Sequence, residues 1–379
     1  MRKLIAVLAG AAIVASMAGC SSQVGGENES GYTQAHLLMS TTVGDNSNSA
    51  RMCVLFAEMV SEATDGAVTV DVFTSDQLSG GDMAKGIDML SSGGTSCAFE
   101  PVDSLAALDE RLMTLNIAWT FDSYEQAEEM LNGSAGEYIA DLLEPKGLTT
   151  LGFIHNGMRQ LTNATRTVTT PEDLEGIKIR VPGGEPFMQA FTLMGADPLT
   201  MSFSELYTGM SQGTVDGQEN GYDLIYNNSF YEVQPYITEW NYSYGAFALV
   251  FNSEIWNSLN EQTQQAIQEV ADEVCATGNA NVVNSEAEQR QAILDYGCEI
   301  TVLTEEQIKA FQDVLVEQGY YEYFYNKYGA DKKLHKTSDQ RVTPYQMILH
   351  NQRYYLVACH EKWKKLGHYR LDRITDIRL

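Results

Sequence analysis

Arg180 is a cation inside an apolar strand pattern, in a chain of 379 residues with 24 Lys and Arg against 51 Asp and Glu. The alternation over residues 177–182 places Ile177 and Ile179 on one face of the strand and Arg180 on the other. A guanidinium fork can give two parallel, charge-assisted hydrogen bonds to a planar carboxylate. An arginine in a strand can also pair with an acid of the protein itself. The pattern therefore indicates either a captured anion or an internal ion pair.

The segments around Arg180 predict the elements that position it. Residues 170–173 and 202–205 have the spacing of capping boxes, the first with proline at the first helical position. The apolar spacing predicts a helix over residues 185–194, and a further strand is expected over residues 214–216. This succession is a βαβαβ half of a doubly wound sheet.

Asn220 follows the last of these strands, as Arg180 closes the first. Ligands of such sheets bind outside the carboxyl ends of the strands, so both polar groups are expected at one crevice. Asparagine also bonds readily to nearby backbone, and Asn220 can equally be a turn cap within residues 217–221.

Four segments in this order and spacing resemble one known family, the solute-binding proteins of tripartite ATP-independent periplasmic (TRAP) transporters, or DctP-type receptors. The matching segments are residues 156–163, 171–182, 202–207 and 215–220 with 231–234. The resemblance covers residues 32–328 approximately. It implies an α/β, two-lobed periplasmic-binding-protein fold, of the flytrap kind, with doubly wound sheets and a long helix that spans the lobes.

The resemblance also implies roles for four residues. Arg180 would pair with the substrate carboxylate, Arg159 would support it, Asn220 would orient it and Phe203 would wall the pocket. For Arg159 the alternative is a solvated loop arginine. For Phe203, at a helix start, the alternative is a core position.

Asp82 and Glu100 match positions near the ligand in some relatives, and the resemblance adds them to the candidate ligand-binding residues. Asp82 can instead be the N-cap of a helix that buries Ile87 and Leu90. Glu100 ends an apolar run before Pro101, which is also typical of a buried acid at a strand edge.

The lobe boundaries follow from the same resemblance. Lobe I is expected over residues 32–156 plus 246–285, and lobe II over residues 157–245 plus 286–328. Asn260 is expected to cap the long helix, which the pattern interrupts at Gly278 and resumes over residues 287–296.

The first residues predict the localisation. Arg2 and Lys3 precede an apolar stretch over residues 4–17, which is too short to span a bilayer, and Cys20 follows it. This resembles a lipoprotein signal, residues 1–20, with lipid on Cys20 anchoring an extracytoplasmic protein to the membrane. Residues 21–31 are then a flexible tether.

The other five cysteines form no zinc-ligand spacing and no even disulfide framework. Cys275 and Cys298 can either bridge or remain buried free thiols. We expect no metal and no cofactor. The acidic balance also argues against a nucleic-acid partner.

Residues 329–379 differ in charge from the rest of the chain, with 11 Lys and Arg against 5 Asp and Glu, compared with 13 against 46 in residues 1–328. Their strand pattern resembles part of a WYL domain at residues 343–345, 353–357 and 369–374. WYL domains belong to cytoplasmic regulators, which conflicts with a lipoprotein signal. We therefore interpret this segment as foreign sequence from a frameshift, fusion or assembly error.

Taken with the resemblance, the sequence predicts a receptor for a small organic carboxylate, without enzymatic activity, that serves the small and large membrane subunits of a TRAP transporter. We find no nucleophile elbow, zinc-protease, P-loop or dinucleotide motif in a fitting context. A lipoprotein receptor of an ATP-driven importer is the alternative. A ligand-sensing regulator would depend on the WYL-like tail alone.

Overall fold

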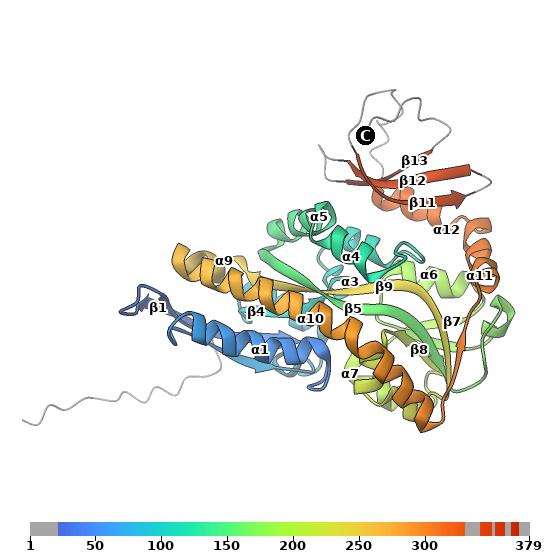
Figure 1. Cartoon of the computed structure of the whole chain (residues 1–379), viewed down its shortest axis with the longest axis horizontal. Coiled ribbons are helices and arrows are strands. Elements are labelled where there is room, and N and C mark those ends of the chain that lie inside the picture. Colours follow the sequence, from blue (N-terminus) through green and yellow to red (C-terminus); the bar gives the residue numbers. More distant parts are fainter. Residues whose placement is uncertain (1–21, 330–341, 351–352, 361–364, 371–379) are drawn as a thin grey trace, which may run out of the picture.

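The computed structural model of the chain describes residues 22–329, 342–350, 353–360 and 365–370 (Figure 1). Ten strands of this part form one mixed sheet in the order β1-β2-β4-β9-β5-β8-β6-β7, with β3 beside β2 and β10 beside β9. Their bounds are β1 Gln23–Glu27, β2 Thr33–Thr41, β3 Val68–Phe73, β4 Cys97–Pro101, β5 Leu148–Asn163, β6 Lys178–Val181, β7 Asp197–Thr200, β8 Gly217–Asn220, β9 Tyr236–Asn252 and β10 Glu299–Val302. We name the part around β2, β3 and β4 lobe I and the part around β6, β7 and β8 lobe II.

The two lobes are joined by the long strands β5 and β9. These pair antiparallel from Leu148↔Asn252 to Asn163↔Tyr236, while β9 also pairs with β4 and β5 also pairs with β8. The expected doubly wound sheets are therefore the two ends of one continuous sheet, because β5 and β9 run through both.

Twelve α-helices of the described chain pack around this sheet. They are α1 Asn48–Ala63, α2 Met83–Ser92, α3 Val102–Leu105, α4 Tyr124–Leu131, α5 Ser134–Leu143, α6 Glu185–Leu193, α7 Phe203–Ser211, α8 Tyr222–Asn227, α9 Ser253–Ser258, α10 Glu261–Tyr296, α11 Glu305–Glu317 and α12 Tyr320–Phe324. The helix expected over residues 185–194 is α6. None of the described helices is both long enough and apolar enough to cross a membrane.

The long helix α10 runs the length of the molecule beside α1 and across both lobes (Figure 1). Asn260 caps it by accepting from the Thr263 N–H at 3.0 Å. The expected interruption at Gly278 is wrong, since the helix is continuous over 36 residues. A Cβ at Gly278 would lie 2.9 Å from Ile154 Cγ2 and 3.1 Å from Met52 Cγ, so the glycine permits close packing instead of ending the helix.

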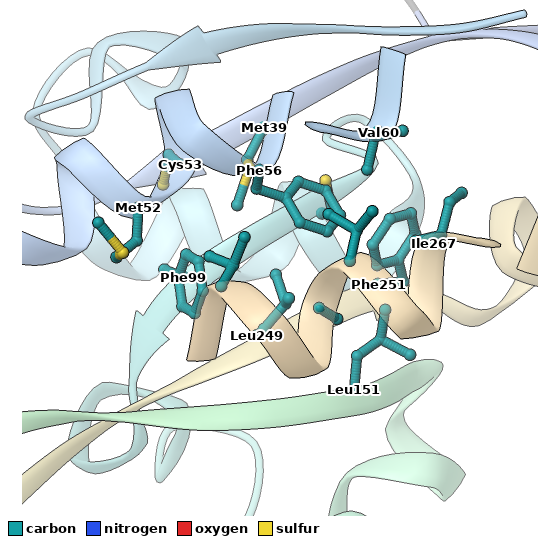
Figure 2. Close-up of a cluster of buried hydrophobic side chains, with 14 of the residues drawn as sticks. Met39, Met52, Cys53, Phe56, Val60, Phe99, Leu151, Leu249, Phe251 and Ile267 are labelled. Atoms are coloured by element: carbon teal, nitrogen blue, oxygen red, sulfur yellow. The ribbon is translucent and has the colours of Figure 1, made fainter. Parts of the chain in front are cut away.

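The core of lobe I forms where α1 and α10 pack on the sheet. Figure 2 shows Phe56 of α1, Phe251 of β9 and Ile267 of α10 in this cluster. Phe56 and Phe251 meet edge to face, with ring centroids 6.2 Å apart. At its other end, α10 contributes Ile293 to a cluster of lobe II. The helix thus anchors in both lobes.

Three local expectations differ from the structure. Residues 23–27, expected as tether, form β1, which pairs antiparallel with β2 while its side chains stay exposed. Residues 214–216 close the end of α7 through the Thr214 N–H, which donates to Gly209 O at 2.8 Å, so the strand begins only at Gly217. The hydroxyl of Ser202 bonds the Glu205 carboxylate at 2.9 Å, which leaves no reciprocal bonds to backbone and hence no capping box.

Four cysteines of residues 22–329, namely Cys53, Cys97, Cys275 and Cys298, are free and buried. Cys275 faces Gly152 of β5, and Cys298 donates to the Tyr231 carbonyl at 3.3 Å. The possible bridge between Cys275 and Cys298 is therefore not formed. Cys20 lies outside the described residues.

The C-terminal strands form a separate sheet in the order β11-β12-β13, over Val342–His350, Arg353–His360 and Lys365–Arg370. It lies beyond α12 in Figure 1. The residues just before it belong to lobe II, because Phe311, Leu315, Phe324 and Tyr328 are buried in the same cluster as Trp240.

Candidate functional site

A cleft with roughly 330 Å³ of space not filled by atoms lies between the lobes. Its polar lining is Thr42, Asp103, Ser104, Asn156, Arg159, Arg180 and Asn220, and its apolar lining is Val43, Met83, Pro101, Pro182, Phe203, Leu224 and Phe247. This mixture of a few convergent polar groups and apolar side chains is typical of a site for a small molecule. The four residues expected to act together in lobe II and β5, namely Arg180, Arg159, Asn220 and Phe203, all line it.

Arg180 reaches the cleft through local structure that residues 170–181 specify. Thr170 and Asp173 form the expected capping box around a 3-10 turn, Pro171–Leu174, and β6 follows. β6 runs parallel to β8, with Arg180 opposite Gln218. Arg180 and Asn220 therefore lie at the carboxyl ends of neighbouring parallel strands, where α/β sheets place ligands.

The guanidinium of Arg180 is buried without an ionic partner among the described residues. The residue is 2% exposed. Its Nε–H donates to the Met201 carbonyl at 2.9 Å, and its Cζ lies 6.0 Å from the centre of the Phe203 ring. Burial lowers the pKa of Arg180 to about 10, which the carboxylates of Glu219 and Asp103 only partly offset. The group is thus charged at neutral pH, and its terminal nitrogens are available for an anion.

Arg159 differs from Arg180 in that the protein supplies its counter-ion. Its Nη2 donates to Glu219 Oε1 at 2.7 Å and to the Glu219 carbonyl at 2.9 Å, and its Nε also bonds the carboxylate. Tyr242 donates its hydroxyl to the same carboxylate at 2.5 Å. Burial alone would lower the pKa of Arg159, but Glu219 outweighs it and raises the pKa above its usual value. The internal ion pair considered for Arg180 is formed by Arg159 instead.

The asparagines of the cleft come from β5 and β8. Asn220 donates its amide to Gln218 Oε1 at 2.6 Å, so it is held within the strand by a side chain rather than capping a turn. Asn156 is 6% exposed, and its Oδ1 accepts no hydrogen bond from the described residues. The end of β8 packs closely against the middle of β5, since a Cβ at Gly221, the residue after β8, would lie 2.6 Å from the Asn156 carbonyl. Glycine there lets β5 and β8 bring Asn156 and Asn220 into one wall.

Lobe I faces Arg180 with acids and hydroxyls. Asp103 and Ser104 come from α3, and Thr42 follows β2. Asp103 Oδ2 lies 4.0 Å from Arg159 Nη1. Thr42 donates its hydroxyl to Asp76 Oδ2 at 2.6 Å, which places Asp76 directly behind this lining.

Glu100 and Asp82 do not line the cleft. Glu100 is 2% exposed and its Oε2 has no hydrogen-bond partner in the described chain. Burial, followed by the charges of Asp76 and Asp103, raises the pKa of Glu100 well above its usual value. Asp82 accepts from the Lys85 N–H at 3.0 Å and caps α2, which is the alternative considered for it.

Sequence reasoning did not select Asp103, Asn156 or Glu219 as individual site residues. Asn156 and Glu219 lie within the segments that carried the resemblance, but Asp103 has no local signal beyond a short helix start. No group of histidine, cysteine and acidic side chains in the described chain is arranged to hold a metal ion. His155 is buried and bonds the Tyr244 hydroxyl at 2.7 Å, whereas His36 pairs with Asp71 at the surface.

Two family models match the chain. The model for bacterial extracellular solute-binding protein, family 7 (DctP), matches residues 39–327. The model for the WYL domain matches residues 310–379. The matches overlap at residues 310–327, which include Phe311 and Leu315 in the core of lobe II.

Similar characterised proteins agree with the first model. The C4-dicarboxylate-binding periplasmic protein DctP of Shewanella loihica is 27% identical over 303 residues, covering 80% of this chain and 89% of that protein. The 2,3-diketo-L-gulonate-binding periplasmic protein YiaO of Escherichia coli is 31% identical over 265 residues, covering 69% and 79%.

Solved structures share the fold. The sugar acid binding protein DctPAm of Advenella mimigardefordensis, in complex with galactonate, superposes with a TM-score of 0.75 at 26% identity, covering 78% of this chain and 94% of that one. A TRAP periplasmic solute binding protein of Shewanella oneidensis with bound succinate superposes with a TM-score of 0.73 at 28% identity, covering 78% and 95%.

Proposed function

This chain belongs to family 7 of the bacterial extracellular solute-binding proteins, and from that premise we propose that it binds a small organic carboxylate between its lobes and delivers it to a TRAP-type transporter. The observation that carries the proposal is Arg180, a buried guanidinium that lines the cleft and has no ionic partner in the described chain. An isolated buried charge is costly, and a ligand carboxylate offsets that cost with bidentate, charge-assisted hydrogen bonds.

In this proposal Arg180 is the carboxylate clamp and Arg159 supports it. Arg159 is held in place by Glu219 and adds positive potential beside the clamp. Asn220 orients the bound carboxylate, and Phe203 covers the guanidinium face and walls the pocket. Asp82 serves to cap α2, and Glu100 acts from behind the lining.

We propose that binding is coupled to closure of the lobes. The cleft lining comes from both lobes, so a ligand favours the conformation in which both contact it. The connections that would bend are β5 and β9, with α10 spanning both lobes. Asp223 of α8 already bonds across to α1, accepting from the Asn48 N–H at 2.9 Å. Transport would then need no bond chemistry in this protein, which we propose is not an enzyme.

The partners we propose are the small and large integral membrane subunits of a TRAP transporter. A receptor of an ATP-driven importer would use the same two-lobed logic. The relatives support the TRAP assignment, since the succinate-bound neighbour of Shewanella oneidensis is itself named a TRAP protein.

A thermal-shift screen of organic acids on the full chain tests the proposal. We expect at least one monocarboxylate or dicarboxylate to raise the melting temperature in a concentration-dependent way, because a ligand that binds only the folded state stabilises it by mass action. Neutral sugars are the comparison set, because they carry no carboxylate. A screen in which no carboxylate acts, while one of these does, would contradict the function.

We further propose that the protein is extracytoplasmic and anchored through lipid on Cys20. The support is the sequence of residues 1–20, in which a basic start and a short apolar stretch precede the cysteine. Cys20→Ser should move the protein from the membrane fraction to the soluble fraction, as measured by immunoblotting after fractionation. Membrane association that is unchanged in this variant would exclude the anchor.

We propose the lobe boundaries given in the sequence analysis.

We also propose that residues 329–379 are foreign to the receptor. The buried cluster of lobe II extends to Tyr328, which stacks on Phe324 with ring centroids 5.4 Å apart, while Lys327 pairs with Glu110 at 2.8 Å. The described tail is a three-stranded sheet whose outer strands, β11 and β13, each pair on one side only. A segment of about 50 residues buries little surface, and open strand edges are a liability.

We therefore expect limited proteolysis to remove the tail before it cuts either lobe. Mass spectrometry of the fragments should identify first cleavage after residue 328, and the remaining protein should bind the same acid with unchanged affinity. Cleavage that begins inside a lobe, or loss of binding together with the tail, would show that the segment is integral to the receptor.

A further inference from the structure

We propose that the substrate is a hydroxylated monocarboxylate, bound with its one carboxylate on Arg180 and its hydroxyl groups toward lobe I, and that the cleft discriminates against dicarboxylates. This inference rests on the proposed function and narrows it. It follows from the charges and the unused hydrogen-bonding groups around the cleft.

The first observation is that the cleft has one unneutralised cation. Of the arginines in its lining, Arg159 is paired with Glu219, and Arg180 is free of ionic partners in the described part of the chain. Asp103 lies in the same lining, 4.0 Å from Arg159. Glu219 and Asp103 both lie against Arg159, so before any ligand enters Arg180 is the arginine of the lining without a carboxylate in contact. One ligand carboxylate has a direct partner, and a second would have none.

The second observation is that the cleft lining contains buried or partly buried acceptors for which the described residues supply no donor or only one distant donor. Asn156 is buried in the lining, and its Oδ1 accepts no hydrogen bond from the described residues. Asp103 presents a carboxylate, and the hydroxyl hydrogen of Thr42 is already donated to Asp76. Buried acceptors without donors cost free energy, and ligand hydroxyl groups can satisfy them. A second carboxylate offers no hydrogen to these groups.

The third observation is Glu100, a carboxyl that the protein buries outside the cleft lining but close enough to feel the charges of Asp76 and Asp103. Its Oε2 is buried without a partner in the described chain, and its neighbours are Asp76 and Asp103. Burial and these two charges raise the pKa of Glu100 well above its usual value, so the surroundings oppose a further negative charge. A ligand carboxylate on this side would meet the same opposition.

The experiment compares acids that differ only in whether the far end is a hydroxyl or a carboxylate. The pairs are 4-hydroxybutyrate and succinate, erythronate and meso-tartrate, and galactonate and galactarate. Isothermal titration calorimetry on the full chain at neutral pH should give a dissociation constant at least about tenfold lower for the monocarboxylate of each pair that binds.

A variant pair assigns the discrimination to lobe I. Asp103→Asn removes a charge from the cleft lining while preserving the shape of the side chain. It should improve dicarboxylate binding, and so reduce the ratio of the dissociation constants of dicarboxylate and monocarboxylate at least about threefold. The matched control is Asp88→Asn, which removes the same charge from an exposed position of α2 outside the cleft. This control should leave the ratio unchanged.

The outcomes separate this inference from the proposed function. A dicarboxylate that binds as tightly as its hydroxyl counterpart, or binding of succinate with no binding of any hydroxylated monocarboxylate, overturns the substrate class and leaves the receptor function intact. If no acid tested binds in a way that Arg180→Ala weakens, both the substrate class and the receptor function are overturned. If Asp103→Asn and Asp88→Asn reduced the ratio of the two dissociation constants equally, the lobe I lining would not be the source of the discrimination.

Discussion

Arg180→Ala is expected to abolish binding of the organic acid, with the affinity falling by at least about 30-fold, since losing one partner of a buried, hydrogen-bonded charge pair typically costs about 2–5 kcal/mol. The group is 2% exposed, and its nearest aromatic neighbour, Phe203, cannot replace its hydrogen bonds. Calorimetric titration with the tightest acid from the screen measures the effect. Unchanged affinity would refute the clamp.

Two controls make this result specific. Arg166→Ala removes an exposed arginine of lobe II that bonds only backbone carbonyls, so binding should not change. Arg180→Lys keeps the charge but loses the planar fork, and should bind more weakly than the native protein and more tightly than Arg180→Ala.

The ligand-free stability of the Arg180 variants should distinguish a ligand clamp from a structural ion pair. Because no carboxylate of the described chain pairs with Arg180, its removal leaves no opposite charge stranded in the interior. Arg180→Met, which largely fills the same volume, should therefore unfold at a temperature equal to or above that of the native protein without ligand. A marked fall would mean that Arg180 holds the fold together.

Glu219→Gln is expected to lower the free energy of unfolding by about 3–5 kcal/mol, the cost typical of breaking a buried ion pair by removing one partner. Arg159 is 1% exposed and Glu219 is fully buried, so the arginine would keep its charge in the interior with only Asp103 nearby. Tyr242 would also lose the carboxylate to which it donates. Urea unfolding followed by circular dichroism measures the change.

The double variant Arg159→Met/Glu219→Gln should recover part of this loss, because it removes both charges together. Asp313→Asn is the surface comparison, since it breaks the exposed pair with Lys309 on α11 and should have no measurable effect. If Glu219→Gln were as mild as Asp313→Asn, the Arg159 pair would not be part of what stabilises the cleft wall.

Much of the setting of Arg180 was predictable from short stretches of sequence. The capping box at Thr170 and Asp173 and the β6 strand depend on neighbours within a few residues. The rule that ligands bind at the carboxyl ends of parallel strands then placed Arg180 and Asn220 together, as the pairing of β6 with β8 does in the structure. The resemblance extended this to a two-lobed architecture.

Other local patterns were misleading because packing decided them. Glycine usually weakens a helix, yet Gly278 lies inside continuous α10, where the approach to Ile154 and Met52 compensates. Ser202 and Glu205 have the spacing of a capping box, but their side chains bond one another. Residues 23–27 have a linker composition and nevertheless pair with β2.

By itself the sequence determined that this chain presents a strand arginine to a crevice of an α/β sheet, since strand alternation, caps and turns are local; the two-lobed receptor came from the family resemblance. Only the tertiary structure decided which arginine is free. Arg159 and Glu219 are sixty residues apart, and they pair because β5 and β8 lie antiparallel with Leu161 opposite Glu219. Asp103 of lobe I comes within 4.0 Å of Arg159 because β4, which precedes it, pairs with β9 in the same sheet. The charge balance of the cleft, and with it the ligand that fits, depends on contacts between distant segments that no local pattern encodes.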